Sequence, residues 1–244
     1  MGHCYKYGTA RYAHTATLLN SGKVLITGGS GSSGALAGSE LFDPSTGQWN
    51  TTASMATARG THTATLLNSG KVLITGGSGS SGALASSEIF DPWTGQWNTT
   101  ASMATARDAH TATLLSSGKV LITGGFGSSD ALASSEIFDP STGQWNTTAS
   151  TTTARGTHTA TLLNSGKVLI TGGSGSTGAL ANSEIFDPWT GQWNTTASMA
   201  TARYAHTATL FNSGKVLVTG GFPFARYGGS GSVYILANSE IYDP

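Results

Sequence analysis

Residues 29–34 read Gly-Ser-Gly-Ser-Ser-Gly and directly follow an apolar run at residues 23–28. The pattern G-x-G-x-x-G after a strand is typical of a loop that binds the pyrophosphate of a dinucleotide. Such a loop leads into a helix, whose N-terminus holds the phosphates. Here the chain continues through Ala-Leu-Ala to another predicted strand at residues 39–43. We therefore interpret the stretch as a flexible loop between two strands, and we expect no nucleotide and no other cofactor.

Histidine and arginine recur at fixed positions and could form two ring-shaped sites. The tetrad His-Thr-Ala-Thr begins every 48 residues, and an arginine lies three residues before each of these histidines. Five imidazoles around a channel could bind a metal ion, and five guanidinium groups could bind an anion. We favour a structural role, in which each arginine pairs with a repeated carboxylate such as Glu40 and each histidine forms a hydrogen bond with the backbone. These histidines are His14, His62, His110, His158 and His206, and we expect no metal site.

A 48-residue repeat positions all of these residues. Each unit is predicted to contain four short strands, which in the first unit lie at residues 14–19, 23–28, 39–43 and 48–54. Helical periodicity is absent, and turn residues such as Asn20-Ser21-Gly22 separate the strands. A four-stranded meander of this size cannot bury both of its faces alone. Packing the copies face to face around an axis solves this problem, so the repeat predicts an all-β, five-bladed β-propeller.

The units resemble the kelch repeat. The residues that carry the resemblance are a Gly-Gly pair after the second strand, an aromatic residue in the third and a tryptophan in the fourth, which in the first unit are Gly28-Gly29, Phe42 and Trp49. The fifth unit keeps Gly220-Gly221 and Tyr242, but the sequence ends before its tryptophan. The resemblance implies a propeller, and the number of blades comes from the repeat itself. We place the kelch-like blades at residues 8–55, 56–103, 104–151, 152–199 and 200–244 plus 1–7.

The N-terminal residues fall where a fourth strand of the fifth blade would lie. Aligning residues 7–17 with residues 55–65 places Tyr7 on Met55. We therefore predict that residues 3–8 complete the last blade and close the ring, which leaves no blade short of a strand. The whole chain, residues 1–244, is then one propeller domain.

Composition excludes several classes of protein. The 244 residues have 38% hydrophobic content and a formal net charge of zero, which gives no electrostatic footprint for nucleic acid. No apolar run is long enough for a membrane span, and a single cysteine excludes an internal disulfide. The N-terminus has no apolar signal-peptide core, which favours a cytosolic or already processed chain. Four Asn-Thr-Thr sequons are candidates for N-glycosylation, and with the Ser/Thr-rich composition they tip the expectation slightly toward an extracellular glycoprotein. The sequon asparagines are Asn50, Asn98, Asn146 and Asn194.

Two groups of tryptophan have different expected environments. One tryptophan recurs in the fourth strand of each complete unit, and we expect this set to be structural and to lie in the core. The set is Trp49, Trp97, Trp145 and Trp193. Trp93 and Trp189 instead replace a turn serine in the second and fourth units only, and we expect them to be exposed as ligand or assembly contacts.

The copies differ most in the loops on one rim. In the fifth unit Glu240 follows Glu184 by 56 residues rather than 48, so the loop before it carries eight extra residues. Exposed aromatic residues with one arginine suit stacking on a sugar or anchoring a protein partner. The alternative is that the insert only plugs the channel or covers the closure seam. The candidate ligand-binding residues are Tyr12, Tyr204, Phe222, Phe224, Arg226, Tyr227 and Tyr234.

Kelch propellers include galactose oxidase, a copper radical oxidase whose chemistry needs a Cys–Tyr pair with Tyr and His ligands. Cys4 is the only cysteine, and it lies in the strand expected to close the ring, while His3 is the only histidine outside the repeat. We therefore expect a non-enzymatic scaffold that presents its rim loops to a protein or carbohydrate ligand. One alternative is a self-assembling extracellular structural protein, and another is an oxidase of the galactose-oxidase type.

Overall fold

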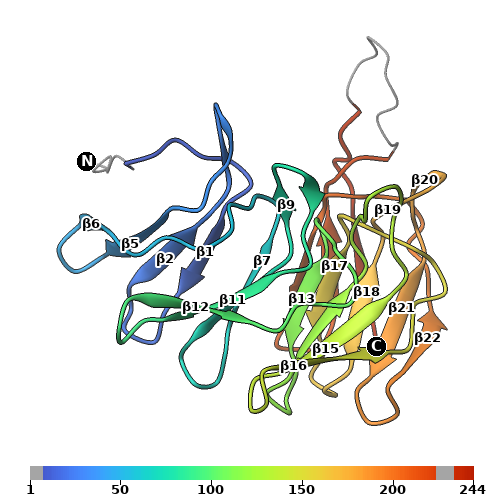
Figure 1. Cartoon of the computed structure of the whole chain (residues 1–244). Coiled ribbons are helices and arrows are strands. Elements are labelled where there is room, and N and C mark those ends of the chain that lie inside the picture. The colour runs from blue at the N-terminus through green and yellow to red at the C-terminus, as the bar shows by residue number, and fades with distance from the viewer. Residues whose placement is uncertain (1–7, 224–233) are drawn as a thin grey trace. The chain divides into compact units, whose positions relative to one another are not determined.

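The computed structural model describes residues 8–223 and 234–244, which form strands, turns and loops (Figure 1). These described parts of the chain contain no helix, so none that could cross a membrane. The all-β prediction is confirmed. The predicted closing strand lies mostly outside the described residues, as do Phe224, Arg226 and Tyr227 of the long fifth loop.

The strands form one antiparallel sheet, or blade, for each copy of the repeat. The strand order across each sheet follows the chain. Blade one contains β1 (Thr15–Leu18), β2 (Val24–Thr27), β5 (Ser39–Asp43) and β6 (Gln48–Thr51). Blade two contains β7 (Thr63–Leu66), β8 (Val72–Thr75), β11 (Ser87–Asp91) and β12 (Gln96–Thr100). Blade three contains β13 (Thr111–Leu114), β14 (Val120–Thr123), β15 (Ser135–Asp139) and β16 (Gln144–Thr148).

Blade four contains β17 (Thr159–Leu162), β18 (Val168–Thr171), β21 (Ser183–Asp187) and β22 (Gln192–Thr196). Blade five has three strands among the described residues, namely β23 (Thr207–Leu210), β24 (Val216–Thr219) and β25 (Ser239–Tyr242). The four strands expected in each of the first four units are therefore all present, at the expected positions.

The Gly-Ser-Gly-Ser-Ser-Gly stretch is more ordered than expected. It forms a small hairpin of β3 (Ser30–Gly31) and β4 (Gly34–Ala35), in which Ser30 pairs with Ala35 and Gly31 with Gly34. The equivalent stretches at residues 77–82 and 173–178, the latter with Thr177 in place of a serine, form the same hairpin. These hairpins consist of β9 (Ser78–Gly79) with β10 (Gly82–Ala83) and of β19 (Ser174–Gly175) with β20 (Gly178–Ala179). The stretch leads into a strand, as expected, but it is a paired hairpin rather than a flexible loop, because its glycines accept the backbone angles that a tight turn needs.

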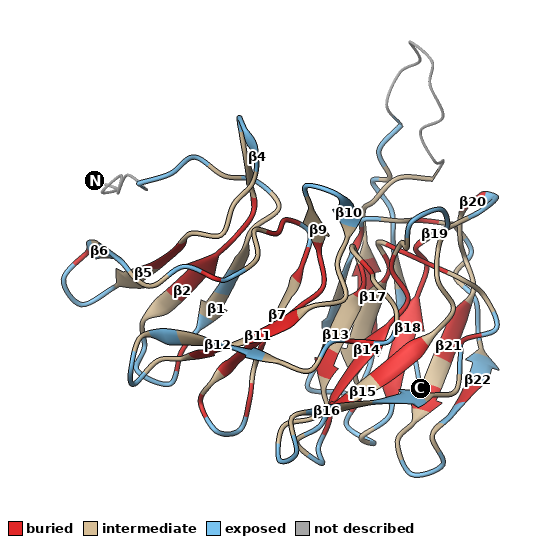
Figure 2. Ribbon diagram, viewed as in Figure 1, coloured by how far each residue is buried: buried red, intermediate tan, exposed pale blue. Residues whose placement is uncertain are grey.

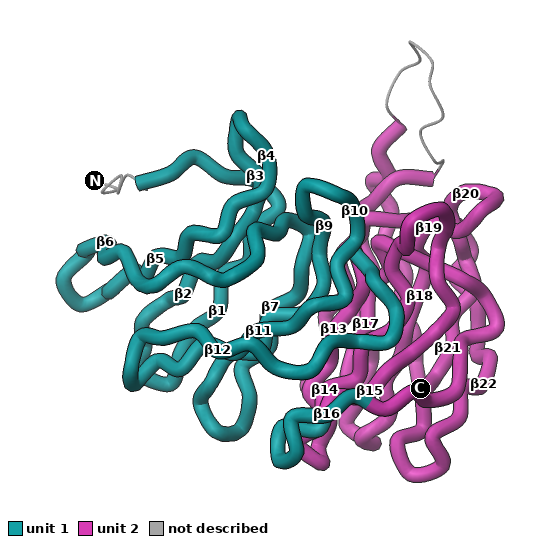
Figure 3. Tube along the Cα trace, in the orientation of Figure 1, with its two compact units in different colours: residues 1–108, 139–145 teal, residues 109–138, 146–244 magenta. Residues whose placement is uncertain are grey.

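The chain consists of two compact units (Figure 3). One contains residues 1–108 and 139–145, and the other contains residues 109–138 and 146–244. Within the first unit, the core cluster combines buried side chains of blades one and two, such as Leu25, Met55, Ile74 and Phe90. That the whole chain forms one domain stays a prediction.

Burial follows the position of each strand in its blade (Figure 2). Every residue of β8, β14 and β18, the second strands of blades two to four, is buried. The fourth strands β12 and β16 instead contain only exposed and half-buried residues. The core therefore lies between sheets, as expected for a meander whose two faces are covered by neighbouring copies.

Candidate functional site

The repeated arginines serve the frame rather than an anion site. Arg59 is fully buried, and its guanidinium group donates to the Gly76 carbonyl at 2.7 Å and to a carboxylate oxygen of Glu88 at 2.8 Å. Glu88 also accepts hydrogen bonds from the backbone of Ala56 and Thr57, at 2.7 and 3.1 Å. This ion pair thus connects the end of β8, the neighbouring strand β11 and the segment that leads into β7. The same pairing occurs in Arg11–Glu40, Arg155–Glu184 and Arg203–Glu240, as expected from the sequence.

The repeated histidines connect one blade to the next. The His62 ring nitrogen Nε2 lies 2.9 Å from the Thr15 hydroxyl and 3.2 Å from the Thr27 hydroxyl, both in the preceding blade. The pKa of His62 is lowered to about 3, mainly by burial and also by the charge of Arg59, while the Arg59 backbone partly offsets the shift. His62 is therefore neutral at pH 7. The hydrogen-bond partners of its Nε2 atom are two threonine side chains, which sequence reasoning missed when it expected a backbone partner. Within residues 8–223 and 234–244, no group of three or more His, Cys, Asp or Glu side chains could hold a metal ion.

The Gly-Gly pair marks a close approach between blades. The Gly29 amide donates to the Arg59 carbonyl at 2.8 Å. Gly28 and Gly29 have φ values of 58° and 96°, which favour glycine. A Cβ on Gly28 would overlap the Arg59 carbonyl oxygen, and a Cβ on Gly29 would lie 2.7 Å from the Tyr12 carbonyl oxygen. These glycines are needed for packing, which explains the pair without any phosphate.

Immediately after the Gly-Gly pair, a two-residue β-bridge positions the loops that differ among blades. In blade five, the Tyr204 amide donates to the Phe222 carbonyl at 3.1 Å, and the Phe222 amide donates back at 3.0 Å. The same bridge joins Tyr12 to Ser30, Gly60 to Ser78 and Gly156 to Ser174. The backbone geometry is thus the same in these four blades, while the two side chains change from one blade to another. This is the arrangement of a rigid frame that presents variable residues.

Two of the predicted ligand-binding residues are in contact at this bridge. The rings of Tyr204 and Phe222 have their centroids 5.4 Å apart, with an angle of 31° between their planes, and both residues are half-buried. The residue equivalent to Tyr204 is Gly60 in blade two and Gly156 in blade four, and a Cβ on Gly156 would overlap the Phe126 ring. Blade five therefore has two aromatic residues at this bridge, whereas the bridges of blades two and four carry glycine and serine and that of blade one carries Tyr12 and Ser30.

The other predicted rim residues have more exposed positions. Tyr234, near the end of the long fifth loop, is 70% exposed, and Ile235 beside it is exposed to the same extent. Tyr12 is 69% exposed but belongs to the first compact unit, whereas Tyr204 belongs to the second. That Tyr12 joins the same surface as Tyr204 stays a prediction.

Comparisons with known proteins agree with this geometry. The family model described as the Attractin/LZTR1 beta-propeller matches residues 3–225. The chain belongs to this family. The solved structure of YjhT resembles this propeller with a TM-score of 0.75 and 15% sequence identity, over 96% of this chain and 82% of that one. At that identity the likeness concerns the fold alone. No curated protein matches the sequence. The kelch-type resemblance is thereby confirmed, and propellers of this type commonly serve as interaction scaffolds.

The repeated tryptophans of the propeller pack between blades. Trp97 Nε1 donates to the Ala53 carbonyl of the preceding blade at 2.8 Å, and its ring lies 5.0 Å from that of Phe90. Most of the repeated tryptophans are half-buried, and Trp193 is the most buried of them, at 9% exposure. The asparagines of the four sequons lie in the same outer strands and are exposed. Their glycosylation stays a prediction.

The two turn tryptophans of the propeller are exposed, as expected. Trp93 is 88% exposed and Trp189 is 95% exposed. A shallow pocket beside Trp93 is lined by Pro92, Leu19 and Asn20, among others. Sequence reasoning missed this pocket, although the replacement of the turn serine by tryptophan was a signal for it.

Proposed function

We propose that this propeller is a non-enzymatic interaction scaffold that binds a protein partner through the aromatic rim surface of blade five. We define this surface by Tyr204, Phe222 and Tyr234, and we extend it by Phe224, Arg226 and Tyr227 of the same loop. Its role is to recognise a partner, and the five-fold frame serves to hold the loop in place. Carbohydrate is the alternative ligand, because stacked aromatic rings also suit sugars.

The observation that carries the proposal is the contrast between the constant bridge and its changing side chains. Blades two and four fill the bridge with glycine and serine, and these bridges have the same backbone hydrogen bonds as that of Tyr204 and Phe222. The aromatic residues of blade five are therefore not required to form the bridge. Large aromatic side chains that the frame does not need are typical of binding hot spots, where tyrosine, tryptophan and arginine dominate.

The chain itself provides the substitution that tests this proposal. The double variant Tyr204→Gly/Phe222→Ser gives blade five the bridge residues of blades two and four. We expect it to fold with an unfolding free energy close to that of the wild type and to lose binding. Both proteins should be screened on a protein array and on a glycan array, with circular dichroism to verify the fold.

The double variant Trp93→Ser/Trp189→Ser is the matched control, because it removes two aromatic residues from turns outside the rim surface. Protein binders lost only in the Tyr204/Phe222 variant support the proposal. Binders found only on the glycan array, and lost in the same variant, assign the surface to carbohydrate instead. Binders that respond equally to both variants, or to neither, contradict it.

Self-association is the second candidate, favoured by the almost complete exposure of Trp93 and Trp189. Each replaces a serine that blades one and three use in the same turn, so neither is needed for the turn itself. Sedimentation at several concentrations tests this function. A wild-type chain that stays monomeric throughout the concentration series would remove it, and an assembly abolished by Trp93→Ser/Trp189→Ser would support it.

A further inference from the structure

Three turns of blades one and two surround a pocket of about 170 Å³ beside Trp93. They are the hairpin turns at residues 19–23 and 67–71, and the turn at residues 91–95 that carries Trp93. All three belong to the first compact unit. The buried Leu19 and the almost fully exposed indole of Trp93 both line the pocket, which therefore extends from the edge of the core to the solvent.

Hydrogen bonds fix the backbone of these turns. In the turn that carries Trp93, the Gly95 amide donates to the Asp91 carbonyl at 2.8 Å, and the Trp93 amide donates to the Asp91 carboxylate at 3.0 Å. The Thr52 hydroxyl of blade one donates to the Gly95 carbonyl at 3.2 Å, which ties this turn to the preceding blade. The two hairpin turns are each closed by a backbone bond of 2.8 Å. The pocket is thus preformed, so a ligand has few groups to order when it binds.

The indole of Trp93 is not needed for its turn. In blades one and three the same position is serine, and the hydroxyls of Ser45 and Ser141 donate to the turn aspartate at 2.5 and 2.6 Å. Among the described residues, the Trp93 side chain makes no such bond. The backbone bond to the aspartate is 3.0 Å long for both Ser45 and Trp93. Blade two therefore carries an exposed aromatic ring in place of a side-chain hydrogen bond, which is typical of a residue that binds something else.

The polar groups of the pocket are available to a ligand. The Asn20 side chain lies over Gly70, since a Cβ on Gly70 would be 3.2 Å from the Asn20 Nδ2. Gly70 is accordingly buried, whereas the equivalent Gly22 is exposed. Within residues 8–223 and 234–244, neither Asn20 nor Ser21 forms a side-chain hydrogen bond, although both line the pocket. An amide offers donors and an acceptor, and a hydroxyl offers both.

The charge and size of the pocket restrict the class of ligand. The described residues that line it are all uncharged. The nearby Asp91 carboxylate already pairs with Lys71 at 3.0 Å. A charged ligand would lose hydration here without a countercharge, so a neutral ligand is favoured. The volume is close to that of a cavity of ~150 Å³ that takes one benzene-sized ring, and it is below the roughly 300–1,000 Å³ of pockets for larger ligands.

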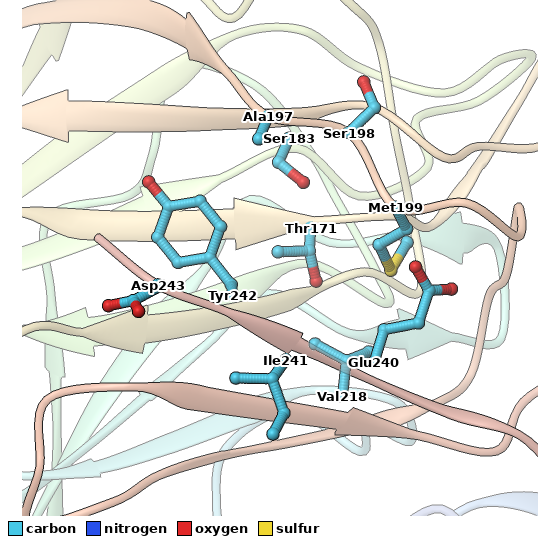
Figure 4. Close-up of a pocket in the computed structure, with 10 residues that line it drawn as sticks. All are labelled: Thr171, Ser183, Ala197, Ser198, Met199, Val218, Glu240, Ile241, Tyr242 and Asp243. Carbon is cyan, nitrogen blue, oxygen red and sulfur yellow. The ribbon is translucent and has the colours of Figure 1, made fainter.

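A pocket in the other compact unit offers a ligand less. Glu240 and Tyr242 are among the residues that line it (Figure 4). The Glu240 carboxylate already pairs with Arg203 and accepts hydrogen bonds from two backbone amides. The Tyr242 hydroxyl lies 2.9 Å from that of Thr196. These polar groups are engaged within the protein, whereas those beside Trp93 are not.

We propose that the pocket beside Trp93 binds one pyranose ring of a neutral saccharide. The apolar face of the sugar would lie on the indole, and its hydroxyl groups would bond to the Asn20 amide and the Ser21 hydroxyl. A pyranose has an apolar face and a hydroxylated edge, and an aromatic ring beside uncharged amide and hydroxyl groups matches both. The site lies outside the rim surface of blade five, so either can bind its ligand without the other.

The second compact unit repeats these residues with one change. Ninety-six residues after the first set, the chain again has leucine, serine, glycine, proline and tryptophan, namely Leu115, Ser165, Gly166, Pro188 and Trp189. Asn20, however, is replaced by Ser116. A Cβ on Gly166 would be 3.8 Å from the Ser116 Oγ, so the shorter side chain covers its glycine less closely than Asn20 does. We therefore expect a weaker sugar site at Trp189.

The test uses the full chain with isotope-labelled indole nitrogens, followed by NMR. The probes are the methyl glycosides of glucose, galactose, mannose and N-acetylglucosamine. The variants Trp93→Ser and Trp189→Ser assign the two indole signals, and they keep the turn because blades one and three use serine there. We expect at least one glycoside to shift the Trp93 signal saturably, with a dissociation constant on the order of 1 mM. The Trp189 signal should shift only at higher concentration.

The chain itself provides the variants that test the polar contact. Asn20→Ser gives the first site the residue of the second, and it should weaken binding about three- to tenfold, because one neutral hydrogen bond is lost. Ser116→Asn should strengthen binding at Trp189 by a similar factor. Tyr204→Gly/Phe222→Ser should change neither, so failure of the rim surface and failure of this site are distinguishable.

Several results would overturn the proposal. A Trp93 signal that no glycoside shifts, even well above the expected dissociation constant, removes the site, as does equal affinity of the wild type and Asn20→Ser. Glucuronate that binds more tightly than the neutral glycosides rejects a neutral ligand. A proline-rich peptide that shifts the Trp93 signal when no glycoside does would assign the pocket to a polypeptide. A signal that moves with protein concentration but not with glycoside would assign it to a second copy, and either result rejects a saccharide.

Discussion

The Thr61 amide donates a hydrogen bond to the Ala13 carbonyl oxygen at 3.0 Å, although the two residues are 48 positions apart. The corresponding bonds run from Thr157 to Ala109 at 2.9 Å and from Ala205 to Thr157 at 3.0 Å. All these residues directly precede a repeated histidine and have a left-handed backbone, with φ between 47° and 51°. Within each compact unit, neighbouring blades are therefore joined at a strained residue, which the bond and the adjacent histidine hold in place.

Replacing Thr61 by glycine should stabilise the protein. A β-branched residue in the left-handed region costs more than alanine, and glycine has no steric penalty there. We expect Thr61→Gly to raise the unfolding free energy by ~1 kcal/mol and Thr61→Ala, the residue of blades one, three and five, to raise it by less. Urea unfolding measures both. A Thr61→Gly protein less stable than the wild type would show that the hydroxyl or methyl group makes a compensating contact.

Gly28 and Gly22 should respond differently to the same substitution. Both have positive φ, 58° and 81°, but only Gly28 faces the Arg59 carbonyl, whereas nothing lies within 4 Å of a Cβ on Gly22. We expect Gly22→Ala to cost ~1 kcal/mol of backbone strain and Gly28→Ala to cost ~3 kcal/mol or more, because the blades must also move apart. Thermal unfolding followed by circular dichroism gives the comparison, and equal losses would contradict the packing role of Gly28.

The buried carboxylate of Glu88 should matter more than its equivalent in blade five. Glu88→Ala leaves Arg59 charged and buried without its partner, and loss of one member of a buried pair typically costs about 3–5 kcal/mol. Glu240 pairs with Arg203 in the same way, but its side chain is partly exposed, so water replaces some of the lost interaction. We expect Glu240→Ala to cost less than half as much. Chemical unfolding at pH 7 compares the two variants, and the opposite ranking would refute this account.

Acid should destabilise the fold through the histidines. The pKa of His62 is lowered to about 3 in the folded chain, below the ordinary value of 6.5. Between these pH values the unfolded chain binds a proton that the folded chain does not, so the unfolding free energy falls as the pH decreases from 6.5 toward 3. It is unaffected by this group above pH 6.5. The slope is about 1.4 kcal/mol per pH unit for each such histidine.

The variant His62→Gln isolates this contribution. It keeps a side chain that can bond the Thr15 hydroxyl but removes the titration. Urea unfolding at pH 7.5, 6.0 and 5.0 should therefore show a shallower loss of stability for the variant than for the wild type. Parallel pH profiles would mean that the pKa of His62 is the same in the folded and unfolded states.

Two tryptophans four residues apart should have opposite importance for stability. Trp193 is nearly buried and donates to the Ala149 carbonyl, whereas Trp189 is almost fully exposed. We expect Trp193→Ala to cost about 3–5 kcal/mol, as for other buried aromatic truncations, and Trp189→Ser to change stability by less than about 0.5 kcal/mol. Differential scanning calorimetry compares them. A large loss for Trp189→Ser would indicate a contact that the exposed position does not reveal.

The sequence predicts the local elements well because their signals are local. The Asn-Ser-Gly turn at residues 20–22 forms as expected: Gly22 has φ of 81°, and its amide donates to the Leu19 carbonyl at 2.9 Å. The ion pairs of the repeated arginines were also predictable, since charge and spacing recur together. Each of these patterns is weak in a single unit but recurs from unit to unit, and the number of units predicts the number of blades.

Contacts between blades were less predictable. Nothing about Thr61 marks it as left-handed, since its conformation is imposed by the bond to Ala13 and not by its own preference. The threonine partners of His62 lie 35 and 47 residues away, beyond any local pattern. The hairpin at residues 30–35 was also missed, because a stretch of serine and glycine has no strand propensity of its own. These features depend on the neighbouring sheet, which a single unit of sequence does not describe.

The inter-blade contacts have a consequence for how such a chain can change length. The contacts of Thr61, His62, Trp97 and Thr52 all join a residue to the equivalent position, or one near it, in the adjacent copy. An unequal recombination event that adds or removes one whole 48-residue copy would therefore create no new type of junction, because each copy has the donor on one side and the acceptor on the other. Gene duplication can lengthen this array without a new solution to packing, and selection is left to act on the loops.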